Sequence, residues 1–101
     1  MEKPVTSPSP DDVAARIRQE LQIVLDPEIG RSVVDIGLIY AITVGPGDAV
    51  TIDMTTTTQG CPATGFLVDG VRDCVLESGL AGSVEVRLTY DPPWTPDMMA
   101  D

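Results

Sequence analysis

One cysteine in this chain lies where a thiol would be reactive. Cys61 follows the polar run Thr57-Thr58-Gln59-Gly60, between a strand-like and a helix-like segment, and it precedes Pro62. Proline lacks an N–H and has a fixed φ, so it suits the first position of a helix. Cys61 would then lie at the helix N-terminus, where unpaired amides and the helix dipole favour the thiolate. Because the thiolate attacks electrophiles and binds soft metals, the segment predicts a reactive-thiol or metal-ligand site.

The alternative for Cys61 is a buried structural position, because free cysteine often packs as a small hydrophobe. The flanking Gly60 and Pro62 and the polar threonines argue against it. The second cysteine, Cys74, falls within an apolar helical stripe and is predicted to pack in the core, with a thiolate at an oligomer interface as the alternative. If both cysteines lie on one helix, roughly 20 Å of helical rise separates them. A disulfide needs Cα atoms closer than about 7 Å, so such a bridge is excluded in that case.

Carboxylates, hydroxyls and one indole could complete a site around the cysteine. Asp26 and Glu28 flank a proline in a loop, where they could act as acid/base groups or hard metal ligands. An Asx-type turn with a solvated acid is the alternative. Thr57 and Thr58 are predicted to line a polar pocket beside Cys61. Trp94, the only tryptophan, either folds over that pocket or a partner's surface, or plugs the edge of the core.

The chain contains no histidine. This excludes a Ser-His-Asp triad, a Cys-His dyad and a His-ligated metal site within one chain. A metal would have to be held by cysteine, carboxylate or hydroxyl groups, or by a second molecule. Two cysteines are too few for a disulfide scaffold.

Composition limits the class of protein. A length of 101 residues with 43% hydrophobic residues predicts one domain, over residues 9–99, after a disordered arm over residues 1–8. No apolar stretch is long enough to span a membrane and the N-terminus lacks a signal peptide's apolar segment, so a cytoplasmic location is expected. Six basic and sixteen acidic residues give a formal net charge of −10. Such a surface disfavours nucleic acid and either attracts a partner with a basic patch or serves solubility alone.

Hydrophobic periodicity predicts five elements. A capping serine, a proline and two acids begin a helix that ends before a proline-containing turn. Alternating apolar and polar positions predict strands, the first two joined by a Gly/Pro loop. The predicted elements are a helix over residues 9–25, strands over 38–44 and 50–55, a helix from 62 capped by Gly79, and a strand over 84–90. The second helix has one apolar stripe: Ala63, Phe66, Leu67, Gly70, Val71, Cys74 and Val75.

The order of these elements is α-β-β-α-β. The first two strands should form an antiparallel hairpin, and the second helix should be a right-handed crossover to a parallel third strand. Each helix has one apolar stripe. We therefore predict a two-layer α/β (α+β) domain, in which both helices pack on one face of a small mixed three-stranded sheet.

Four motifs in the same order resemble the PaaD/SufT-like family of metal–sulfur cluster biosynthesis proteins, which includes the eukaryotic MIP-type targeting factors. The resemblance runs from about residue 11 to residue 99. The motifs are DPEIG at residues 26–30, VDIGLIY at 34–40, TTQGCP at 57–62 and DPPWTPDMM at 91–99.

The resemblance implies a small α/β domain with a role in iron–sulfur cluster assembly or in delivering clusters to client enzymes. Cys61 matches the family's signature cysteine, Asp26 and Glu28 match its acidic loop, and Thr57 and Thr58 match the polar residues before the cysteine. The implied cargo is a labile iron–sulfur cluster or iron, with none expected in aerobically purified protein. The implied partners are client metalloenzymes and cluster carrier proteins.

One chain cannot hold a [2Fe–2S] cluster by thiolates alone, since four are needed. A second Cys61 across a homodimer, an external thiol or a client's cysteines would have to complete the set. Two other functions stay open. The protein could be a non-catalytic adaptor or accessory subunit of a multicomponent oxygenase, or a cysteine-dependent tailoring enzyme in which Asp26 or Glu28 serves as the base.

Overall fold

The structure is a computed structural model that describes residues 10–57, 60 and 63–99. The arm predicted over residues 1–8, and the positions of Thr58, Cys61 and Pro62, lie outside the described residues. The helices and strands, in chain order, are α1 (Pro10–Glu20), β1 (Ile39–Val44), β2 (Ala49–Met54), α2 (Thr64–Ser78) and β3 (Ser83–Leu88).

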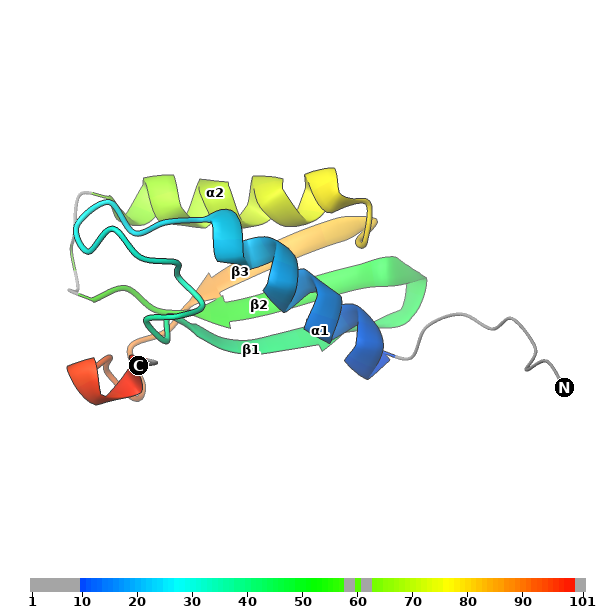
Figure 1. Ribbon diagram of the computed structural model, residues 1–101. Helices are drawn as coiled ribbons and strands as arrows, with labels where there is room; N and C mark the ends of the chain where they lie inside the picture. Colours follow the sequence, from blue (N-terminus) through cyan, green and yellow to red (C-terminus); the bar gives the residue numbers. More distant parts are fainter. Residues whose placement is uncertain (1–9, 58–59, 61–62, 100–101) are drawn as a thin grey trace, which may run out of the picture.

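The three strands form one mixed sheet in the order β1-β2-β3. β1 and β2 pair antiparallel, and β2 and β3 pair parallel. α1 lies against β1 and α2 against β3, and both helices cover the same face of the sheet (Figure 1). The predicted two-layer α-β-β-α-β architecture is confirmed.

Alternation along β2 decides which face of the sheet is buried. Val50, Ile52 and Met54 are almost fully buried beneath the helices, whereas Thr51 and Asp53 point to the other face and are partly exposed. This is the period-two pattern of a strand with one covered side. The helix-free face of the sheet is therefore polar along its central strand.

The first helix is shorter than predicted. α1 ends at Glu20, and a single 3-10 turn over Leu21–Ile23 follows it. The chain then becomes extended, because Val24 has φ −84° and ψ 116° and Leu25 forms an antiparallel bridge with Ser32. The pairing of Leu25 with Ser32 requires an extended backbone, so the helical segment ends before Leu25 and not at the residue before Pro27.

The apolar stripe of α2 is wider than the surface available to cover it. Leu67, Val71 and Val75 are buried, but Phe66 is 68% exposed. Phe66 belongs to the apolar stripe predicted for this helix, but it lies on a helical row beside the buried one, and none of the described strands or helices covers it. Gly79 ends the helix with φ 77°, which confirms the predicted left-handed cap.

The last segment of the chain returns to the beginning of β1. A 3-10 turn over Pro96–Met98 packs against Gly37. Gly37 has φ +81°, and an added Cβ there would lie only 2.6 Å from the carbonyl oxygen of Met98. The close approach of these two backbones therefore requires glycine.

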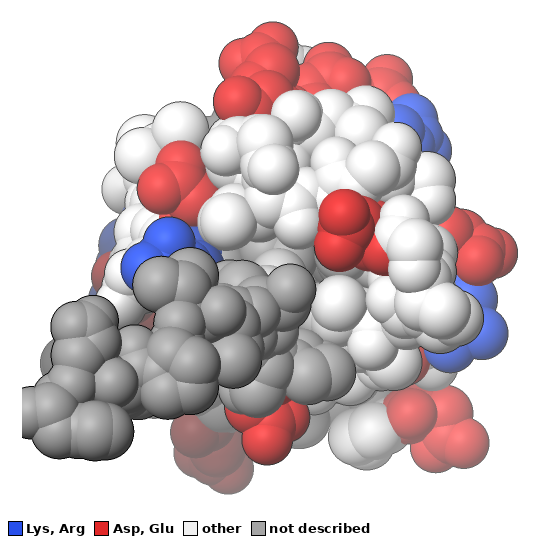
Figure 2. All heavy atoms as spheres, turned by 90° about the vertical axis from the view of Figure 1, so that its right-hand side faces the viewer, with Lys and Arg blue, Asp and Glu red and all other residues white. Residues whose placement is uncertain are grey.

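Acidic side chains lie at several separate places on the face shown in Figure 2. At the end of the molecule seen in Figure 2, acidic side chains surround an uncharged centre and a few basic ones lie among them. Among the described residues, no helix is both long and apolar enough to traverse a lipid bilayer.

Candidate functional site

The backbone that leads toward Cys61 continues the sheet beyond the end of β2. The amide of Thr55 donates to the carbonyl of Leu38, at 2.9 Å. On the other side, the hydroxyls of Thr56 and Tyr90 lie 2.8 Å apart and form a hydrogen bond. Thr55 and Thr56 are both buried. This end of the sheet is therefore fixed on both sides up to the residue before Thr57.

Two of the predicted site residues meet at this end. The hydroxyl of Thr57 donates to Oε1 of Glu28, at 3.5 Å. Glu28 belongs to the loop that follows α1, so the contact joins the acidic loop to the strand end that precedes Cys61. The structure thus brings Glu28 of the DPEIG motif against Thr57, the first residue of the TTQGCP motif, although the two residues are far apart in the sequence.

Asp26 shapes the acidic loop from within. Its side chain is 2% exposed, and its Oδ1 accepts hydrogen bonds from the amides of Glu28 at 2.7 Å and Ile29 at 3.3 Å. The amide of Gly30 donates to the carbonyl of Asp26 at 2.7 Å and closes the turn. This is the Asx-type turn weighed as the alternative for Asp26. A part for the carboxylate in chemistry stays a prediction.

The turn predicts a difference between two substitutions of Asp26. Asp26→Ala removes the acceptor of two amides and should lower the free energy of unfolding by about 1–2 kcal/mol. Asp26→Asn keeps an oxygen acceptor and should cost less than about 0.5 kcal/mol. Urea denaturation of the three proteins measures this. Equal losses for both variants would mean that the negative charge, rather than the acceptor, stabilises the loop.

Trp94 lies at the edge of the core. Its indole N–H donates to the carbonyl of Ile36 at 2.6 Å, and its ring packs against the buried cluster. The hydroxyl of Tyr40 donates to the carbonyl of Pro92 at 2.8 Å and holds the same segment from the sheet. This arrangement matches the alternative in which the tail plugs the edge of the core.

Sequence reasoning missed both tyrosines of this region. The contact of Tyr90 with Thr56 could have been predicted from the parallel pairing of β2 with β3. The last pair within the two strands is Met54 with Leu88, and two residues further along both strands the same register places Thr56 beside Tyr90. Tyr40 bonds a residue of the C-terminal segment, and no local pattern points to that contact.

Cys74 packs against the core as predicted and is half-buried. Its thiol donates to the carbonyl of Glu20, at 3.2 Å. Burial raises the pKa of the Cys74 thiol, and the negative charges of Glu20 and Glu77 raise it further. Since the thiolate is the form that binds metal, the raised pKa makes Cys74 a weaker ligand than a cysteine with the ordinary value.

The raised pKa predicts slow alkylation of Cys74. In a Cys61→Ala variant, Cys74 is the only thiol left. Its labelling by iodoacetamide should follow a pH profile with a midpoint above the ordinary value of about 8.5. Unfolding in urea should bring the midpoint back to that value and serves as the control. A native midpoint at or below the ordinary value would contradict the environment described here.

The described residues by themselves do not form a metal centre. Among residues 10–57, 60 and 63–99, no three Cys, Asp or Glu side chains lie together in a way that could hold a metal ion. The whole chain has two cysteines, fewer than the four thiolates that bind most iron–sulfur clusters. A cluster held by thiolates on this protein would need sulfur donors from another molecule.

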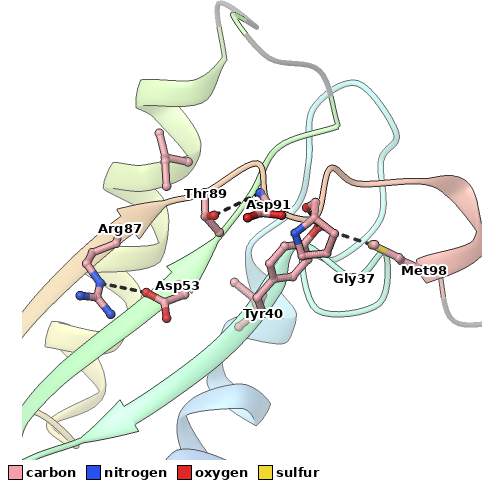
Figure 3. A pocket seen from close by; sticks show the side chains of 10 residues that line it. Gly37, Tyr40, Asp53, Arg87, Thr89, Asp91 and Met98 are labelled. Carbon is pink, nitrogen blue, oxygen red and sulfur yellow. Dashed lines mark hydrogen bonds and ion pairs between the residues drawn. The ribbon is translucent and has the colours of Figure 1, made fainter.

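A broad groove lies on the helix-free face of the sheet, near the C-terminal segment. Its volume is about 950 Å³. Figure 3 shows Tyr40, Asp53, Arg87, Thr89 and Asp91 around it, with the Arg87 guanidinium turned toward Asp53. The Nε of Arg87 lies 2.9 Å from Oδ1 of Asp53. The positive charge in this groove is thus already paired within the chain.

The comparisons with known proteins agree with this architecture. Residues 14–88 match the family described as iron-sulfur cluster assembly protein. A domain of unknown function from Bacillus anthracis has a solved structure with a TM-score of 0.85 and 30% identity, covering 89% of this chain and 86% of that one. The chain therefore belongs to the iron–sulfur cluster assembly protein family.

Several curated relatives carry functional names, among them two Fe-S protein maturation factors. The Fe-S protein maturation auxiliary factor SufT of Staphylococcus aureus is 38% identical over 78 residues, which cover 77% of this chain and 89% of that protein. An Fe-S protein maturation auxiliary factor of Porphyromonas gingivalis is 42% identical over 81 residues, which cover 80% of this chain and 77% of that protein. The resemblance read from the four motifs is confirmed.

Proposed function

We propose that this protein helps to assemble or deliver iron–sulfur clusters for client metalloenzymes, with Cys61 as a transient ligand of iron or of a cluster in transit. Membership of the family and the names of the two maturation factors support the general role. The observation that carries the local part is the contact between Thr57 and Glu28. It brings the acidic loop against the strand end that leads, within a few residues, to Cys61.

An incomplete set of ligands suits transfer. A cluster that receives one thiolate from this chain needs the rest from a client, a carrier protein, an external thiol or a second Cys61 in a homodimer. Such a cluster is exchanged more readily than one enclosed by four cysteines of a single protein. We propose that the exchange takes place in the cytoplasm, and that the acidic loop and Thr58 contribute the polar surroundings of the ligand.

Anaerobic reconstitution with iron and sulfide tests the role of Cys61. The wild-type protein should take up iron and show the visible absorption of a cluster, and Cys61→Ala should lose most of both. Cys74→Ala is the matched control and should keep them, since Cys74 bonds the Glu20 carbonyl and has a raised pKa. Equal iron content in the wild type and Cys61→Ala would refute ligation by Cys61.

A non-catalytic adaptor is the second candidate, favoured by an exposed apolar groove beside α2. In this function Cys61 has no direct role in binding the clients. Co-purification of clients should then survive Cys61→Ala. Trp94→Ala is a poor test of docking, because the indole is bonded to Ile36 and packs against the core.

A further inference from the structure

An apolar groove runs along one row of α2. Three of the most exposed large hydrophobic side chains of the described chain line it, namely Ile23 at 76%, Leu25 at 52% and Phe66 at 68% exposed. Its volume is about 470 Å³. Soluble monomers rarely expose such clusters without a use, and apolar patches rimmed by polar groups mark interaction sites. We call this surface the Phe66 groove.

The rim of the Phe66 groove is acidic. Asp73 and Glu77 line it, and among the described residues no lysine or arginine does. The nearest arginine along the helix, Arg72, is paired with Asp69 at 3.1 Å. Burial raises the pKa of Cys74, a lining residue, and the negative charges of Glu20 and Glu77 raise it further. The carboxylates of Asp73 and Glu77 thus place a negative potential over an apolar floor.

The walls of the groove are formed before any partner binds. On one side lies α2, and on the other the chain is held by the bridge between Leu25 and Ser32 and by the bond from the Val33 amide to the Val24 carbonyl, at 2.9 Å. Gly70 of α2 lies opposite Val24. A Cβ added at Gly70 would lie 3.6 Å from a methyl carbon of Val24, which is an ordinary van der Waals contact. A preformed surface loses little conformational entropy on binding.

We infer that the Phe66 groove docks a short amphipathic segment of a partner protein, whose apolar side chains are flanked by lysine or arginine. The apolar residues would cover Ile23, Leu25 and Phe66, and the basic ones would meet Asp73 and Glu77. Apolar anchors supply most of the affinity of such interfaces, and complementary charge supplies specificity and association rate. The inference stands on the groove alone and does not require Cys61 to bind iron.

The charge of this protein argues against two other occupants. A second copy carries the same formal net charge of −10, so a dimer across this face would bring acidic surfaces together. Anionic lipid would be repelled by Asp73 and Glu77 in the same way. A basic partner segment is the occupant that both the apolar floor and the acidic rim favour.

The probe is a short fluorescein-labelled peptide with leucines at i, i+3, i+4 and i+7 and lysines elsewhere. Fluorescence anisotropy with the full chain measures its affinity. Phe66→Ser with Ile23→Ser should weaken binding by at least about tenfold. Leu76→Ser is the matched control, because Leu76 is 41% exposed and lies outside the groove. That variant should bind as the wild type does, and circular dichroism should show all variants folded.

A second pair of variants tests the rim. Asp73→Asn with Glu77→Gln should weaken binding by several-fold, more at low than at high salt. Glu85→Gln with Asp97→Asn removes the same charge from exposed positions outside the groove and should have little effect. Bound peptide should also slow the alkylation of Cys74 in the Cys61→Ala protein.

Four results would overturn the inference. Equal losses in the groove and control variants, or equal binding of a peptide with scrambled order, would show attraction by net charge only. A dimer in sedimentation that Phe66→Ser abolishes would assign the groove to a second copy. Co-sedimentation with phosphatidylserine vesicles that the same change abolishes would assign it to a membrane. These results are independent of the proposed role of Cys61. Peptide binding, sedimentation and vesicle binding test the groove whether or not Cys61→Ala loses iron uptake.

Discussion

Replacing Gly37 by alanine should destabilise the protein by about 2–4 kcal/mol. Two effects add. Gly37 has φ +81°, a conformation that costs an L-residue roughly 1–2 kcal/mol. The new Cβ would also lie 2.6 Å from the Met98 carbonyl oxygen and 2.9 Å from the Met98 Cβ. Because both are main-chain or near-main-chain atoms, the C-terminal segment would have to move. Urea denaturation followed by the fluorescence of Trp94, the only tryptophan, measures both the stability and the displacement.

Gly30→Ala separates the two effects. Gly30 also has a positive φ, +77°, but an added Cβ there has no heavy atom outside its chain neighbours within 4 Å. It should therefore cost only the conformational part, about 1–2 kcal/mol, and leave the native Trp94 spectrum unchanged. If Gly37→Ala costs no more than Gly30→Ala, the packing of the C-terminal segment on Gly37 does not stabilise the fold.

The sheet and its covered face could be predicted because their signals are local. The alternation of Val50, Ile52 and Met54 with polar residues gave the buried side of β2, and the parallel third strand followed from the crossover rule. Gly79 gave the end of α2 for the same reason, since a helix cap is a property of a few neighbouring residues.

The remaining features depend on contacts between distant segments. Phe66 fits the helical stripe, but only the final packing decides how wide a stripe the sheet and α1 can cover. The contact of Thr57 with Glu28 needs the acidic loop to fold back beside β2, and no spacing in the sequence encodes that. The sequence marks Asp26 as a site candidate, and the hydrogen bonds that its carboxylate accepts from two backbone amides explain why an aspartate is used in the turn.

The position of Cys61 stays a prediction, because the described residues end before it and resume after it.

Replacing Ile52 by alanine should have an effect of similar or greater size. Ile52 lies in the central strand, pairs with Ile42 on one side and Val86 on the other, and is 0% exposed. Truncating a buried isoleucine costs about 2–5 kcal/mol, because the lost contacts and the remaining cavity add. Domains of this size have only about 5–15 kcal/mol in total. Thermal and urea unfolding should therefore show a large loss of stability relative to the wild type.

Thr51→Ala is the matched control on the same strand. Thr51 points to the helix-free face and is partly exposed, so its replacement should cost no more than about 1 kcal/mol. Both residues precede Thr57, the residue that contacts Glu28, by at least five positions, so iron uptake by the folded fraction of both variants should match the wild type. Comparable losses for the two substitutions would mean that the helix-free face of β2 is also buried in solution. Another protein, or a second copy, would then have to cover the face that carries Asp53 and Arg87.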